Sequence, residues 1–167
     1  MPTYVLTRRA ALVSLGAFSA AALAGCNTTP TAGVQPGAAP PGLRIGTINV
    51  DTTPLIAYVG NPTAGWAQQA LPGAFAQAFG ARIAPGDPGA ATLSVRIDTL
   101  YLGGGGPGDP DRMRGVAVLG GHTISVHAVS TYFSSPTDQA LPEQAIQGRV
   151  QELAVAFAYR LKRKLGV

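Results

Sequence analysis

Cys26 is the only cysteine of the chain, and a thiol at this place in the sequence can carry specific chemistry. Without a second cysteine, an internal disulfide is excluded and the thiol has no partner for redox chemistry. Cys26 closes an apolar run over residues 10–24, which follows a pair of arginines and is separated from the cysteine by Gly25. A basic start, an apolar middle and small residues before a cleavage point are typical of a secretory signal. At this position the chemistry to expect of the thiol is lipid attachment.

The four residues Leu23-Ala24-Gly25-Cys26 resemble the lipobox of bacterial lipoproteins. The resemblance implies a diacylglyceryl group on the Cys26 sulfur, cleavage after Gly25 and acylation of the new amine. The competing interpretation is a transmembrane or buried helix in which the cysteine is incidental. Spanning a bilayer takes about 20 apolar residues, and residues 10–25 offer fewer. We therefore expect membrane association through a lipid anchor at Cys26.

Residues on either side of the apolar run bear on export and destination. Thr7-Arg8-Arg9 resembles the start of a twin-arginine signal, although Ala11 stands where that motif prefers a large apolar residue. Both the Sec and the twin-arginine routes stay open. Asn27 follows the cysteine where, in enteric bacteria, an aspartate would indicate retention in the inner membrane. We expect the outer membrane, with the folded part facing the periplasm.

Residues 103–108 match G-x-G-x-x-G, the pattern of dinucleotide-binding loops. Such a site also needs a helix that starts at the glycines and an acid about 20 residues further on. Here Asp109-Pro110 and an expected strand follow instead. We therefore expect no nucleotide site, but a hairpin loop long enough to contact a partner. Asp109 and Asp111 are two carboxylates where Ca²⁺ takes about six to eight oxygens, and we interpret them as solvated turn acids.

The two histidines, His122 and His127, are five residues apart on one expected strand, so they point to opposite faces and cannot share a metal. No H-E-x-x-H, C-x-x-C or G-x-S-x-G pattern occurs in the sequence. Arg96 and Asp98 lie on the polar face of another expected strand, either as a solvated surface or as partner contacts. We expect no metal, no cofactor and no catalytic residue.

A cluster of cations closes the sequence: Arg160, Lys162, Arg163 and Lys164. At about 100° per residue, Arg160 and Lys164 fall on the apolar stripe of the expected last helix, so we expect the helix to leave the core there. Cations complement the negative end of a helix. They also suit anionic lipid headgroups or an acidic partner, at about 1 kcal/mol each near a charged surface. Both roles stay open.

Charge and composition bound the organisation of the chain. Two of the twelve lysines and arginines lie in the expected signal, which leaves ten against eight acids, too small an excess for a nucleic-acid-binding protein. We expect a lipoprotein signal peptide over residues 1–25 and a lipidated cysteine with a Pro/Gly-rich tether over residues 26–42. The tether has four prolines and no charge. Residues 43–167 are expected to form a single α+β domain.

Alternation and turn signals predict four or five strands. Over residues 92–102, five residues are expected on one buried face: Leu93, Val95, Ile97, Thr99 and Tyr101. Further strands are expected over residues 43–50, 114–119 and 122–133, the last two joined by a tight turn at Gly120-Gly121. Residues 54–59 are interpreted as a continuation of the first strand or as a second short strand.

Two amphipathic helices are expected, over residues 64–79 and 142–165. In the first, Thr63 is the expected N-cap, Pro72 should kink or restart the helix, and Gly80 can end it. The second carries one continuous apolar stripe: Ile146, Val150, Leu153, Phe157 and Leu161. The fold class that follows is α+β, a two-layer sandwich of a mainly antiparallel sheet of about four strands with two helices packed on one face.

This element order behind a lipobox is similar to that of lipopolysaccharide-assembly lipoproteins of the LptE type and, more loosely, to that of auxiliary lipoproteins of envelope transport. The resemblance implies a non-enzymatic accessory for outer-membrane assembly or for lipopolysaccharide or lipid transport, with an envelope protein or lipid as partner. Only Cys26 carries a role over from it. The alternative is a lipid-anchored enzyme that acts on cell-wall or lipid material. An enzyme needs convergent acids, bases or nucleophiles, and the sequence offers few ionisable residues.

Overall fold

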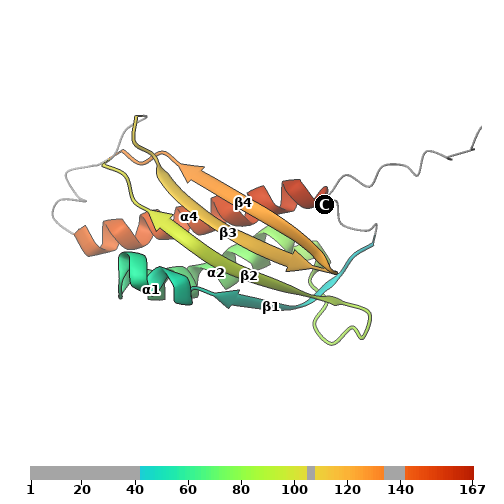
Figure 1. Cartoon of the computed structure of the whole chain (residues 1–167). Coiled ribbons are helices and arrows are strands. Elements are labelled where there is room, and N and C mark those ends of the chain that lie inside the picture. The colour runs from blue at the N-terminus through green and yellow to red at the C-terminus, as the bar shows by residue number, and fades with distance from the viewer. Residues whose placement is uncertain (1–41, 105–107, 134–141) are drawn as a thin grey trace, which may run out of the picture. The chain divides into compact units, whose positions relative to one another are not determined.

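A computed structural model describes residues 42–104, 108–133 and 142–167 (Figure 1). The predicted signal peptide, Cys26 and all of the predicted tether except Gly42 lie outside the described residues. Within those three stretches, no helix is both long and apolar enough to cross a membrane.

Four strands form one mixed sheet in the order β1-β2-β3-β4 (Figure 1). They are β1 (Ile45–Asp51), β2 (Ala91–Tyr101), β3 (Asp111–Leu119) and β4 (His122–Ser130). The last three strands form an antiparallel meander, and Gly120 and Gly121 take positive φ angles of 56° and 82° in the predicted tight turn between β3 and β4. β1 pairs with β2 in parallel, because the segment between them returns the chain to the opposite end of the sheet.

The described helices are α1 (Thr53–Val59), α2 (Thr63–Phe79) and α4 (Pro142–Leu165), and a short 3₁₀ turn, Gly80–Arg82, follows α2. α2 and α4 lie side by side and cover one face of the sheet (Figure 1). The predicted two-layer α+β architecture, with two helices on one face, is therefore confirmed. The predicted bounds of the last helix are confirmed as well.

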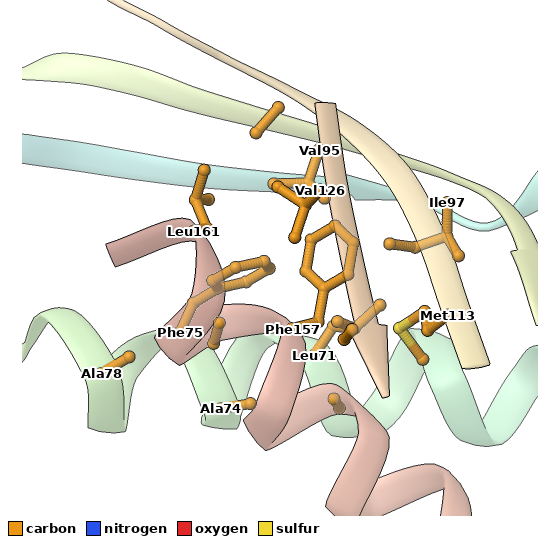
Figure 2. Close-up of a cluster of buried hydrophobic side chains, with 14 of the residues drawn as sticks. Leu71, Ala74, Phe75, Ala78, Val95, Ile97, Met113, Val126, Phe157 and Leu161 are labelled. Atoms are coloured by element: carbon orange, nitrogen blue, oxygen red, sulfur yellow. The ribbon is translucent and has the colours of Figure 1, made fainter. Parts of the chain in front are cut away.

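The core lies between these two helices and the sheet. In Figure 2 the ring of Phe157 points from α4 toward the strands, with Phe75 of α2 beside it at a centroid distance of 6.3 Å and an interplanar angle of 80°. Phe157 and Leu161 of the predicted stripe are fully buried. Burial of a side chain such as Phe157 contributes about 1.5–3 kcal/mol, and the stripe thereby fixes α4 against the sheet.

Residues 54–59 are helical, so the predicted strand there is wrong. Pro54 occupies the first turn of α1, where a missing N–H costs nothing. The Asp51 carboxylate accepts the backbone N–H of Thr53 at 2.9 Å, and hydrogen bonds from Thr53 hold the pKa of Asp51 below its ordinary value. Only Leu55 is buried in this helix. A short apolar run of this length fits a strand and a helix equally well.

The predicted start of α2 is also wrong by one residue. Thr63 is the first helical residue and caps nothing with its side chain, while Pro62 occupies the N-cap position. Pro72 lies inside the helix and does not end it. It ends at Phe79, and Gly80 begins the 3₁₀ turn.

A bulge in β2 overturns part of the predicted alternation. Leu93, Val95 and Ile97 are buried as predicted, but the pairing with β3 shifts between Ile97 and Thr99. Beyond the shift Leu100 takes the buried position, and Tyr101, predicted to be buried, is 48% exposed. An extra residue on one strand reverses which side chains face the core. The strands predicted over residues 114–119 and 122–133 run over Asp111–Leu119 and His122–Ser130 instead.

Candidate functional site

The sheet face opposite α2 and α4 carries the polar and charged side chains of the strands. Alternation places Ser94 and Arg96 of β2 there, with Arg114 of β3 and Ser125 and His127 of β4. A groove of about 310 Å³ crosses this face. Its lining comes from β2, β3, β4 and α4 and includes Asp98, Arg114, Val116, Ser125, His127, Arg160 and Lys164. We call this the basic groove.

The tight turn between β3 and β4 fixes two members of the basic groove. Leu119 pairs with His122 across the turn, and the same register places Arg114 opposite His127. Both side chains point away from the helices because they alternate with the buried Met113 and Val126. Two residues that are far apart in sequence thus form one side of the groove.

The other side of the basic groove comes from α4. Arg160 and Lys164 are four residues apart and so share one face of that helix. In Figure 1, α4 crosses behind β4 and its last turns emerge beyond the edge of that strand. From there the two long side chains line the groove beside His127.

The prediction that α4 leaves the core at Arg160 is wrong, because Leu161 and Leu165 are buried. The cations lie beside the apolar stripe and pass the edge of β4 instead. The structure also divides the predicted cluster of four. Arg163 lines a neighbouring hollow of about 240 Å³ with His127, Tyr159 and Arg160. Lys162 is half-buried and lines neither hollow.

Positive charge dominates the basic groove. Burial and the neighbouring guanidinium groups of Arg114, Arg112 and Arg160 lower the pKa of His127 below its ordinary value. Asp98, the only acid in the lining, pairs with Arg96 at 2.7 Å. Across the described parts of the chain, Arg114, Arg160 and Lys164 form no ion pair. Three permanent cations therefore face the groove without an ion pair to any of the described residues.

A second charged cluster joins the loop after β2 to α4. Asp111 is 1% exposed and accepts the backbone N–H of Gly103 at 2.8 Å and the Arg149 Nε–H at 3.0 Å. Arg149 also donates to the Gly103 carbonyl and lies 4.2 Å from the ring centroid of Tyr132. The hydrogen bonds to Asp111 raise the pKa of Arg149. The interpretation of Asp111 as a solvated turn acid is wrong, since it is the buried anchor of this loop.

Asp109 is an exposed turn acid, as interpreted. It accepts the Gly104 N–H at 2.7 Å and the Tyr101 hydroxyl at 3.1 Å, and the first of these bonds chiefly lowers its pKa. The backbone N–H groups of Gly103 and Gly104 thus donate to two carboxylates of the chain itself. These two amides are occupied, so they are unavailable to the phosphates of a nucleotide.

The remaining candidates stand apart. His122 and His127 are separated by an odd number of positions on β4, so their side chains point to opposite faces of the sheet. Where the structure describes the chain, no three of its His, Cys, Asp or Glu residues come close enough to hold a metal ion. Sequence reasoning missed Arg114 and His127 as neighbours of Arg160. The predicted hairpin already contained the signal, because a two-residue turn sets the whole β3–β4 register.

Comparison with known proteins adds little to this site. No protein-family profile and no curated protein matches the sequence. Among solved structures, a minor lipoprotein from Acinetobacter baumannii is similar at 9% identity and a TM-score of 0.35, over 72% of this chain and 92% of that one. At these values the similarity carries neither the fold nor the function of that protein over to this chain.

Proposed function

We propose that this protein is a lipid-anchored lipoprotein of the bacterial envelope, held by acyl chains at Cys26, with its α+β domain in the periplasm. The observation that carries the proposal is the sequence Leu23-Ala24-Gly25-Cys26 at the end of a basic and then apolar leader. Its role is that of a non-enzymatic accessory in outer-membrane assembly or lipid transport.

The chemistry of the domain supports a binding role over catalysis. A catalytic site brings an acid, a base or a nucleophile together at a reacting atom. The basic groove gathers cations, one histidine and one acid, and that acid is paired with Arg96. Asp111 and Arg149, the other charged pair, bind each other and Gly103 after β2. What the sheet face offers a partner is a positively charged surface.

The substitution Cys26→Ser tests the anchor. We expect it to abolish incorporation of a fatty-acid analogue and to release the protein from the membrane fraction, because no other cysteine can carry the lipid. Stable anchoring takes two or more acyl chains. The measurement is labelling of expressing cells, followed by membrane fractionation.

Asn27→Asp is the matched control, because it leaves the acylated residue intact. We expect full labelling of this variant and, in an enteric host, a shift of the protein toward the inner-membrane fraction. Label on the Cys26→Ser protein would contradict the anchor. An unchanged distribution of Asn27→Asp would contradict the outer-membrane assignment alone.

A further inference from the structure

We propose that the basic groove is a binding site for a phosphate group, held by Arg114 from β3 and by Arg160 and Lys164 from α4, with Ser125 and His127 at its side. This site is separate from the proposed lipid anchor, because it lies in the folded domain and does not include Cys26. It also differs from a general attraction between the cationic helix end and a charged surface, because Lys162 does not take part.

The donor set of the groove indicates the ligand. Guanidinium and ammonium groups only donate hydrogen bonds, and the Ser125 hydroxyl can do so as well. Asp98, the one carboxylate present, is already engaged by Arg96. Among the polar side chains of the groove, donors outnumber acceptors, and this set fits a group made of acceptor oxygens. The guanidinium fork matches phosphate in geometry, and lysine adds a point charge.

Phosphate fits the charge of the groove better than a carboxylate does. Arg114, Arg160 and Lys164 supply three positive charges that the described residues do not neutralise. A phosphate monoester carries about −1.5 to −2 near pH 7, so it compensates more of that charge than a single carboxylate. The volume of about 310 Å³ leaves room for a phosphate and for part of the molecule that bears it.

His127 adds a pH dependence to this site. The titratable and charged groups around it are Arg112 and Arg114 on β3, Asp98 across the groove on β2, and four residues of α4: Tyr159, Arg160, Arg163 and Lys164. The cations disfavour its protonated form. A bound phosphate opposes that repulsion, so binding raises the pKa of His127, and the contribution of the protonated ring to the affinity is lost as the pH rises through that pKa.

The test uses protein from Asn27 onward, which contains every residue of the described core and no acyl chain. Inorganic phosphate is titrated by NMR while the His127 ring is followed over pH. We expect saturable binding and a raised His127 pKa. The pair Arg160→Gln and Lys164→Gln should weaken binding by about tenfold or more, because it removes two charge-assisted contacts.

The pair Arg44→Gln and Lys162→Gln is the matched control, since it removes the same charge from residues outside the groove. We expect less than a twofold effect from it. Vesicles of phosphatidic acid, whose headgroup is a phosphate monoester, and of phosphatidylcholine separate the sources of the phosphate. Binding to the first alone, lost with Arg160→Gln and Lys164→Gln, assigns a lipid headgroup, whereas binding of inorganic phosphate without vesicle binding assigns a soluble phosphate compound.

Two results would overturn the proposal. One is the absence of saturable binding to inorganic phosphate and to both kinds of vesicle. The other is an equal loss of binding in the groove pair and in the control pair, which would mean that only net charge matters. Circular dichroism of both pairs establishes that folding is intact, and exposed cations contribute little to stability.

Discussion

Asp111 and Arg149 form the most buried charged contact among the described residues. Both oxygens of the carboxylate face the guanidinium group, and the Gly103 N–H donates to the same carboxylate. A buried pair of this kind adds little net stability when both partners are present, but it becomes costly when one is removed. The pair holds Gly103, which lies directly after β2, against α4.

Asp111→Ala should lower the free energy of unfolding by about 3–5 kcal/mol, because Arg149 would keep its charge in a site that is only 13% exposed, without its carboxylate. Urea denaturation measures the change. Asp98→Asn is the control, since its pair with Arg96 is solvent-exposed and should leave the midpoint nearly unchanged. Equal effects of the two variants would contradict the structural role of Asp111.

For single residues, the sequence shows which side chains are charged but does not show which residues they contact. Asp111 and Arg149 lie 38 positions apart, and nothing local pairs them. A cluster of four cations was predicted from charge alone as a possible contact with an anionic surface, and that role stays a prediction: Arg160, Lys162, Arg163 and Lys164. Two of them, Arg160 and Lys164, line the basic groove. Arg114 joins them because strand register and helix placement act together, and that combination is a property of the assembled fold.

The bulge in β2 depends on a glycine of the neighbouring strand. Ile97 pairs with Gly115, and the pairing shifts directly beyond it. A Cβ on Gly115 would lie 2.3 Å from the carbonyl oxygen of Arg96. No side chain fits at that distance, so Gly115 lets the backbones approach where β2 bends. The same bend places Tyr101 on the exposed side, where it binds Asp109.

Gly115→Ala should therefore destabilise the protein by about 1–3 kcal/mol, as overpacking does. Gly148→Ala is the matched control, because Gly148 lies within α4 and a Cβ there meets no atom within 4 Å. Alanine in a helix interior should stabilise by about 0.5–1 kcal/mol. Thermal unfolding of both variants gives the comparison, and a neutral Gly115→Ala would mean that the strands can separate at the bulge at little cost.

Elements with long periodic patterns were predictable and short ones were not. The stripe through Phe157 gave α4 its observed bounds, and alternation located β2 as far as Ile97. α1 was missed because seven residues hold too few apolar positions to show a period. The bulge was missed because alternation contains no information on where a partner strand inserts a register shift.

In the whole molecule, the strands differ in how far along the chain their partners lie. β3 and β4 are joined by a two-residue turn, whereas α1 and α2 separate β1 from its partner β2 along the chain. Non-local pairing forms late because loop closure must precede it. We therefore expect the amides of β1 to open before those of β3. Native-state hydrogen exchange measures this order, and equal protection of β1 and β3 would contradict it.

The described chain reaches β1 through Leu43 and Arg44, and β1 lies at the edge of the sheet, with β2 as its strand neighbour and a single bridge from Ile45 to Ile83 on its other side. If acyl chains hold Cys26 in the membrane, a mechanical force between the membrane and the domain is transmitted to the domain through β1. The first contacts to carry that force are then the β1–β2 ladder, the bridge from Ile45 to Ile83 and the packing of Ile45 in the core. When a partner bound to the sheet is pulled away from the membrane, we expect β1 to separate first. The β2–β3–β4 meander, packed against α4, stays folded.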